Sequence, residues 1–390
     1  MPAASSGNFW ALRARDLAAL GAPGDAALLY ARLTRHAAFA SDHRSSVGAV
    51  VRADCPSVRR SSWHDTFAEP LPIGKRAQAF VADTLDFSLP EIQAQHPSAD
   101  GATKLVLRLH DGATVEAVHM PRAVKNPRVT LCISSQVGCA MGCTFCHTAQ
   151  MGLVRNLKAH EIVGQVITLV RALGPRQLGR VSVVFMGMGE PLHNLGEVAR
   201  AIEVLADPAG LDIAPSRITV STSGLVPQIR ELAALAVRPT LALSLNATTN
   251  EARARTMPIT KRWGLDDLRA VLTEFPRRSH EKITIEYVLL RDENDSDADA
   301  ERLAELVRGF RHHVNVIPFN AYDGASFSAP DEEVLARFLA ILRARGCLAT
   351  VRRSRGRDVG AACGQLVQAG KHQRAPNAGR APAPTPRLTT

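Results

Sequence analysis

Short runs of β-forming residues alternate with helical runs from Val129 to about Arg353. The β-rich runs are "VTLCISS", "VSVVFMG", "RITVSTSG", "PTLALSLNA", "KITIEYVLL", "HVNVIPFNA" and "LATVRRS". Segments with helical periodicity separate them, such as "HEIVGQVITLVRAL" and "DEEVLARFLAILRARG". Repeated strand and helix units predict a parallel sheet that is closed or partly closed as a barrel. In such a fold, the side chains that bind ligands lie at the carboxyl ends of the strands.

The segments on either side of this alternation differ from it in composition. Residues 8–95 are rich in Ala, Leu and Arg at helical spacing, which predicts a small helical domain that we place at residues 1–98. The sequence "KLVLRLHDGATVEAVHMP" alternates apolar and polar residues around "HDGA", and this predicts a hairpin within a connecting segment, residues 99–128. The barrel itself is placed at residues 129–366. Residues 367–390 are rich in Pro, Ala and basic residues, so we expect a disordered tail.

Three of the seven cysteines lie close together in "CAMGCTFC", in the loop after the first predicted barrel strand. Cys139, Cys143 and Cys146 are too few to complete a tetrahedral zinc site, although Cys132 or His147 could supply a fourth ligand. Alternatively, three thiolates can hold three corners of a [4Fe–4S] cluster and leave the fourth iron open to a small molecule. The spacing alone leaves both kinds of site open.

The charge and the cysteine count limit the class of protein. The chain has 47 Lys and Arg against 37 Asp and Glu, and a net charge of +10 favours a polyanionic partner such as RNA. An odd number of cysteines in a long chain without a recognisable export signal indicates reduced thiols. No window approaches the run of about 18 apolar residues that a membrane span requires. We therefore expect a cytoplasmic protein that does not associate with membranes.

A second motif, "FMGMGEP", stands at the end of the next predicted strand. Glycines there allow the backbone to approach a ligand, and a carboxylate on such a turn can pair with an ammonium group, so Gly189 and Glu190 are candidate binding residues. The ends of later strands supply the remaining candidates: Ser221 in "VSTSG", Ser244, Leu245 and Asn246 in "LSLNA", and Asn320 in "PFNAY". A polar residue at a strand end can also simply cap the strand.

The three-and-two spacing of the cysteines, with Phe145 before the last of them, resembles the signature of radical S-adenosylmethionine (SAM) enzymes, and "GMGEP" resembles their SAM-binding element. The order of six segments further resembles the RlmN/Cfr family of radical SAM adenine methyltransferases. These segments are "CISSQVGCAMGCTFCHTAQMG", "GMGEP", "STSG", "IEYVLL", "NVIPFN" and "AACGQL". The similarity extends from about Glu116 to Leu366, and it implies a partial (β/α)6 radical SAM barrel.

The resemblance implies two cofactors, a [4Fe–4S] cluster and SAM. In that superfamily the open iron binds the amino and carboxylate groups of SAM, and one electron cleaves SAM to methionine and a 5′-deoxyadenosyl radical. By this resemblance Cys139, Cys143 and Cys146 are the metal ligands, and the SAM-binding residues are Gly189, Glu190, Ser221, Ser244, Leu245, Asn246 and Asn320. The family usually has His at the position of Asn246; Asn can still form hydrogen bonds, but it does not titrate.

The resemblance also implies roles for two distant thiols and a carboxylate. Carbons C2 and C8 of adenine are electron-poor, so direct attack on the SAM methyl group is chemically unattractive. In the family scheme, Cys363 takes a methyl group from one SAM, and a radical from a second SAM abstracts hydrogen from it so that the carbon adds to adenine. Cys132 matches the residue that resolves the covalent RNA intermediate, leaving a transient disulfide with Cys363. Glu116 matches a proton acceptor.

The implied substrate is an adenine of 23S-type large-subunit ribosomal RNA, modified at C2 or C8, with transfer RNA as a second candidate. We expect a monomer that takes electrons from a donor such as flavodoxin. One alternative is a zinc-stabilised RNA-binding protein without radical chemistry, motivated by the basic charge and by the cysteines from Cys132 to Cys146. Another is a radical SAM enzyme that modifies peptides, which would normally have further cysteine pairs near the C-terminus. Cys55 and Cys347 match no motif, and we expect both to be structural.

Overall fold

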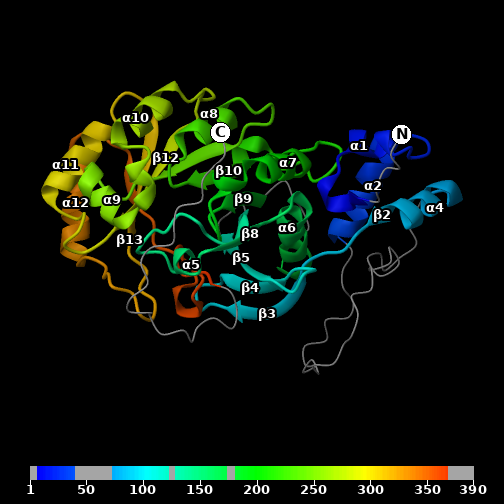
Figure 1. Ribbon diagram of the computed structural model, residues 1–390, viewed down its shortest axis with the longest axis horizontal. Helices are drawn as coiled ribbons and strands as arrows, with labels where there is room; N and C mark the ends of the chain where they lie inside the picture. Colours follow the sequence, from blue (N-terminus) through cyan, green and yellow to red (C-terminus); the bar gives the residue numbers. More distant parts are fainter. Residues whose placement is uncertain (1–6, 40–72, 123–127, 174–180, 368–390) are drawn as a thin grey trace.

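The protein is built on a ten-stranded open sheet (Figure 1). The computed structural model describes residues 7–39, 73–122, 128–173 and 181–367. The strands follow the order β14-β13-β12-β11-β10-β9-β6-β5-β4-β3, so that β14 and β3 are the two edges. The strands from β6 to β14 run parallel, and the other three are antiparallel.

Every β-rich run of the alternating region forms a strand of the parallel part. The strands are β6 (Arg128–Cys132), β9 (Val181–Phe185), β10 (Ile218–Thr222), β11 (Thr240–Ser244), β12 (Ile283–Leu289), β13 (His312–Pro318) and β14 (Ala349–Val351). The short strand β14 extends the edge of β13. The predicted partial barrel is confirmed, because the described strands form a linear sheet rather than a closed ring.

Helices connect the parallel strands. They are α6 (Ala159–Leu173), α7 (Leu195–Leu205), α8 (Val226–Ala233), α9 (Asn250–Thr256), α10 (Leu265–Glu274), α11 (Asp297–Leu306) and α12 (Glu332–Ala344). All of them except α9 bury apolar side chains. Burial is most extensive in α6, where Ile162, Val166 and Leu169 are fully inaccessible to solvent. In the part of the chain that the structure describes, no helix has both the length and the apolar character needed to cross a membrane.

An antiparallel meander extends the sheet beyond β6. It consists of β3 (Glu91–Pro97), β4 (Thr103–Arg108) and β5 (Thr114–Arg122). The hairpin predicted around "HDGA" is confirmed, since β4 pairs with β5 on either side of it. In Figure 1 this meander lies beside the red C-terminal segment, and the two are joined by a hydrogen bond of 2.6 Å from Ser98 to Asp358.

The N-terminal region is mainly helical. It contains α1 (Ala14–Ala19), α2 (Ala26–Phe39) and α4 (Lys75–Thr84), with a minimal parallel pair of β1 (Gly7–Asn8) and β2 (Leu85–Asp86). Phe9 stacks on Phe87 at 4.7 Å and contacts Trp10 edge-on at 5.1 Å. These rings belong to the same apolar core as α6. The domain boundaries stay predictions, and both Cys55 and the predicted tail beyond Val367 lie outside the described residues.

The cysteine loop is framed by a small antiparallel pair, β7 (Gln136–Gly138) and β8 (Leu153–Asn156), and contains the short helix α5 (His147–Gln150). Gly138 has a φ of +77°, and a Cβ at this position would lie 1.9 Å from the carbonyl oxygen of Gly152. Only glycine fits so close a backbone approach. The neighbouring amide of Cys139 donates to the same oxygen at 3.0 Å, which fixes the start of the loop.

Candidate active site

A pocket opens at the carboxyl end of the parallel strands and encloses about 920 Å³, part of it open to solvent. Most of the predicted site residues line it: Cys139, Cys143, Cys146, Gly189, Glu190, Ser221, Ser244, Asn246, Asn320 and Cys363. The fold therefore brings together residues separated by more than half of the chain.

The three clustered cysteines lie together in the wall of this pocket, Cys139 buried and Cys143 and Cys146 half-buried. Burial, and after it the neighbouring Cys146, raise the pKa of Cys139 to about 12. The pKa of Cys143 is also raised, first by burial and then by the other two sulfurs. Three thiolates in one place would repel one another, and a positively charged iron–sulfur group offsets that repulsion and favours the ionised form that ligates metal. The donor set thus fits a [4Fe–4S] cluster held at three corners.

The glycine-rich turn lies directly beside these thiols. Gly189 has a φ of +101°, and a Cβ there would lie 2.5 Å from the Cβ of Gln136, so the turn requires glycine. Glu190 is 4% exposed and accepts hydrogen bonds from the backbone amide and hydroxyl of Ser223 at 2.8 and 2.9 Å. Burial raises its pKa, while these donors oppose the rise. A carboxylate fixed in this way can receive the ammonium group of an amino acid.

Asn246 occupies a backbone conformation that suits its residue type. Its φ is 57°, in the left-handed region that Asn tolerates better than most residues. Its Oδ1 accepts from the amide of Val288 at 2.8 Å, and its Nδ2 lies 3.4 Å from the sulfur of Met257. Ser221 and Ser244 lie at the neighbouring strand ends in the pocket wall, whereas the side chain of Leu245 is buried and is not part of that wall.

A buried arginine that the sequence analysis missed fixes these strand ends. Arg253 has no exposed surface, and its guanidinium donates to the carbonyl oxygens of Ser223, Ser244 and Leu245 at 2.5, 3.2 and 2.9 Å. A further bond of 2.8 Å reaches the hydroxyl of Thr260. Leu245 therefore takes part in the site through its backbone. No pattern in the sequence separates Arg253 from the other arginines of "NEARARTMP", because only its burial is distinctive.

The two distant thiols lie close to each other. Cys363 lines the pocket, whereas Cys132 is buried behind it at the end of β6. Burial raises the pKa of Cys132 to about 12, and Cys363 contributes to the rise. The six described cysteines are free thiols, so the transient disulfide between these two stays a prediction.

The segment that carries Cys363 is anchored to the rim of the pocket. The carbonyl oxygen of Cys363 accepts a hydrogen bond from the Nδ2 of Asn320 at 3.3 Å. The carbonyl oxygen of Gly364 accepts one from the amide of His147 at 2.8 Å. The hydroxyl of Thr148 donates to the carbonyl of Leu366 at 2.5 Å. Because His147 and Thr148 directly follow the last clustered cysteine, these bonds fix the distance between the two thiol-bearing segments.

Glu116 lies outside the pocket wall, and it holds the same segment from the other side. It is 4% exposed, pairs with Lys104 at 2.9 Å and accepts from the amide of Val367 at 3.0 Å. Lys104 also donates to the carbonyl of Gly360 at 3.4 Å. The Lys104–Glu116 pair thus binds the Cys363 segment on both sides of the thiol. The position of Glu116 on a strand of the predicted hairpin gave no sign that its carboxylate is buried.

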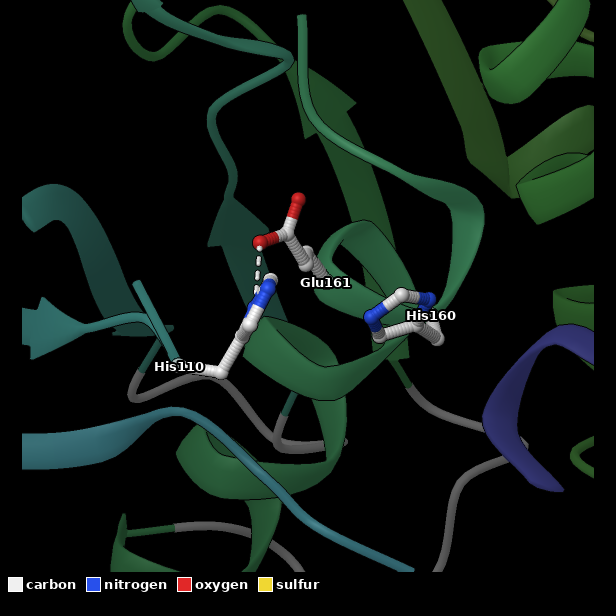
Figure 2. A group of neighbouring side chains, drawn as sticks. All are labelled: His110, His160 and Glu161. Atoms are coloured by element: carbon white, nitrogen blue, oxygen red, sulfur yellow. Dashed lines mark ion pairs between the residues drawn. The ribbon is translucent and has the colours of Figure 1, made fainter. Parts of the chain in front are cut away.

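A second group of potential ligands lies away from the pocket, at the start of α6 (Figure 2). His110, His160 and Glu161 each offer one atom, and these atoms lie within 4.8 Å of one another. However, both oxygens of Glu161 already accept from the guanidinium of Arg155 at 2.8 Å. A metal ion would have to displace or lie against that positive charge, so we interpret the group as an ion-pair network.

The comparisons with known proteins agree with this site. Residues 133–304 match the model of the radical SAM superfamily. A protein named dual-specificity RNA methyltransferase RlmN, from Syntrophotalea carbinolica, is 50% identical over 274 residues, which cover 70% of this chain and 72% of that protein. The chain belongs to the RlmN family. A protein of the same name from Geotalea uraniireducens is 46% identical over 300 residues, covering 77% of this chain and 85% of the relative.

A solved structure extends the RlmN-family similarity to the fold. The crystal structure of a radical SAM methyltransferase from Sphaerobacter thermophilus superposes with a TM-score of 0.78 at 37% identity, covering 92% of this chain and 98% of that chain. Family membership confirms the predicted enzyme class and the two cofactors, a [4Fe–4S] cluster and SAM. The zinc-stabilised RNA-binding protein and the peptide-modifying enzyme, our two alternatives, are not supported.

Proposed function

We propose that this enzyme methylates a ring carbon of adenine, C2 or C8, in 23S-type large-subunit ribosomal RNA, with transfer RNA as a second substrate. The single observation that carries the proposal is the meeting of Cys363 with the three clustered cysteines around one pocket. A cluster site alone is common to radical SAM enzymes, but a free thiol facing the same pocket offers a carrier for the methyl group. The names of the relatives support RNA as the substrate.

Cys139, Cys143 and Cys146 would hold the cluster, and Glu190 with the turn at Gly189 would hold the amino-acid part of SAM. The backbone of Leu245 and the side chains of Ser221, Ser244, Asn246 and Asn320 would complete the SAM site. Bound there, the two cofactors supply one-electron chemistry that removes a hydrogen atom from an unactivated carbon. The pocket wall contains several buried residues, among them Cys139, Glu190 and Asn246, and this limits the access of water to such reactive chemistry.

The structure favours different roles for the two thiols. Cys363 lines the pocket and can reach a methyl donor bound there, so we assign it the carrier role. Cys132 is buried, and because its pKa is raised to about 12 it is a neutral thiol near pH 7. Cys132 does not line the pocket, so it does not compete for the methyl group. Only thiolates are efficient nucleophiles, so Cys132 must lose its proton before it acts. It can act once the carrier sulfur beside it is covalently bound to RNA.

We assign Glu116 as the proton acceptor and expect Lys104→Met to shift the pH dependence of methylation. Burial raises the pKa of Glu116, and the Lys104 ammonium opposes that rise. Without Lys104 the pKa rises further, so the carboxylate becomes protonated at a higher pH, and the acidic limb of the rate profile moves to higher pH. Rates at the alkaline end change less.

The pH–rate profile under single-turnover conditions measures this shift. Lys158→Met is the matched control, because Lys158 is exposed and pairs with Glu197 on the surface. Equal acidic limbs in the wild type and Lys104→Met would show that Glu116 does not titrate in the reaction.

The remaining partners follow from the chemistry. Radical cleavage consumes one electron, so a small redox protein such as flavodoxin is the proposed donor. We also propose a monomer, since one chain contains all the residues assigned here, and a cytoplasmic location, where its RNA substrates are made.

Anaerobic reconstitution with iron and sulfide tests the function directly. We expect a brown protein with iron near four atoms per chain. The reconstituted enzyme, with SAM, a reductant and ribosomal RNA, should yield 2-methyladenosine or 8-methyladenosine in digests analysed by mass spectrometry against both standards. Stoichiometric zinc without iron, or a full complement of iron with neither nucleoside formed on ribosomal or transfer RNA, would contradict the proposal.

A further inference from the structure

Glu286 is a buried carboxylate in the wall of the active-site pocket that none of the assigned roles uses. It lies on β12, within the "IEYVLL" segment, and is 5% exposed. One of its oxygens, Oε1, accepts from the Nη1 of Arg352 at 3.0 Å and from the Nδ2 of Asn315 at 3.1 Å. A charged group this deeply buried is costly unless it is fully paired.

The other oxygen of Glu286 is not paired. Its Oε2 is shielded from solvent and has no hydrogen-bond partner among the described residues. An ionised carboxylate oxygen accepts hydrogen bonds and cannot donate them. Leaving a charged acceptor buried without a partner is costly, so the arrangement is explained if a ligand supplies the donor.

Arg352 keeps this carboxylate in a charged environment next to the reactive thiols. The negative charge of Glu286 raises the pKa of Arg352, and both Cys363 and Cys132 contribute to that rise, so the guanidinium lies within electrostatic reach of both sulfurs. Its Nη1 also contacts the sulfur of Met186 at 3.4 Å. Arg352 thus holds the carboxylate of Glu286 in the wall of the same pocket that Cys363 lines.

We propose that Glu286 Oε2 accepts a hydrogen bond from the amino group of an adenine and selects adenine over purines that lack a donor there. The inference rests on the proposed function, because it takes the pocket to be the place where adenine reacts. Two adenines enter such a site, the target base of the RNA and the adenine of SAM. Both offer the same N–H donor, whereas guanine and hypoxanthine present an oxygen at this position, which a carboxylate repels.

The first arm of the test measures the wild-type holoenzyme with matched pairs of ligands. For the cofactor, calorimetry without RNA compares the dissociation constants of S-adenosylhomocysteine and S-inosylhomocysteine. The second ligand has oxygen in place of the amino group. Mass spectrometry first identifies the methylated position in the RNA. Two RNAs are then compared in binding to the enzyme, one with adenosine at that position and one with purine riboside, which lacks the amino group. We expect one pair to differ by roughly 10- to 100-fold in dissociation constant, as for a hydrogen bond to a charged group. That pair identifies which adenine Glu286 binds.

The second arm repeats both comparisons with Glu286→Gln. Gln can keep its oxygen toward Arg352 and Asn315, but it then presents an NH₂ group to the adenine amino group. For the ligand pair that the wild type discriminates, we expect the ratio of dissociation constants to fall to within about 2-fold in Glu286→Gln. The ratio for the other pair should stay unchanged. Glu281→Gln is the matched control. The side chain of Glu281 is 6% exposed, like that of Glu286, and pairs with Arg238 at 2.6 Å, but it does not line the pocket.

The outcomes are distinct. If the wild type discriminates by less than about 2-fold in dissociation constant in both ligand pairs, the inference is overturned. This outcome does not depend on the stability of the variant, and it would leave water or a ribose hydroxyl as the partner of Oε2. Unchanged discrimination in Glu286→Gln would overturn the inference as well. The cofactor arm needs no RNA, so a failure to methylate RNA would count against the proposed function without deciding this inference.

Discussion

Cys363→Ala is expected to lower RNA methylation by at least about 10³-fold while reductive cleavage of SAM continues. The variant keeps the three clustered cysteines and the turn at Gly189 and Glu190, so cluster and SAM still bind. It removes the only thiol among the described pocket-lining residues that is not one of the three clustered cysteines. Without a carrier for the methyl group, radical formation is uncoupled from methyl transfer.

Two products are quantified in the same reaction. Methyladenosine in the RNA reports transfer, and 5′-deoxyadenosine reports SAM cleavage. Cys347→Ala is the matched control, because Cys347 is a buried free thiol that does not line the pocket. We expect near wild-type transfer from this control. Full methylation by Cys363→Ala would exclude the carrier role, and loss of both products together with loss of iron would point to a structural role instead.

Cys132→Ala is expected to trap RNA on the protein. In the proposed sequence the sulfur of Cys132, once deprotonated, attacks the sulfur of Cys363. The bond from that sulfur to the methylene carbon on adenine breaks, the released carbon takes up a proton to become the methyl group, and a Cys132–Cys363 disulfide remains for later reduction. Removal of Cys132 therefore stops the reaction at the covalent intermediate. Alanine fills less space at the buried end of β6, which costs some stability, but the residue contributes no ligand to the cluster site. The expected yield is close to one RNA per active enzyme, without turnover.

A denaturing gel detects the trapped species as a protein band shifted by the bound RNA. Nuclease treatment should return this band to near the position of the free protein. Peptide mass spectrometry should then find one modified nucleotide on Cys363. The double variant with alanine at both Cys132 and Cys363 is the control, because it has no carrier sulfur and should give no band. Multiple turnover by Cys132→Ala would rule out its role in resolution.

The local patterns of the sequence predicted the fold and the cluster because both depend on short-range information. Alternating β-rich and helical runs give a parallel open sheet wherever the chain must bury apolar faces on both sides. The three clustered cysteines lie within eight consecutive positions, so no folding step is needed to bring them near one another. The strand ends were predicted for the same reason, since the direction of parallel strands places them at one edge.

Long-range contacts decided the rest of the site. The sequence singled out neither Arg253 nor the carboxylate of Glu286, although "IEYVLL" contains the latter, because packing alone buries them. Arg352 likewise gains its importance from the ion pair with Glu286, which lies 66 positions away in the sequence. The Lys104–Glu116 pair is similar, because a hairpin strand that would ordinarily face solvent is covered by the C-terminal segment.

The sequence by itself determined the class of fold, the place of the cysteine cluster and the family. The tertiary structure decided which distant groups meet there: Cys363 beside Cys132, Glu116 against the carrier segment, and a carboxylate oxygen of Glu286 without a partner in the pocket wall. The physical reason is the range of the interactions. Periodicity and spacing act over a few residues, whereas the electrostatics of a buried site depend on side chains that only the complete fold brings together.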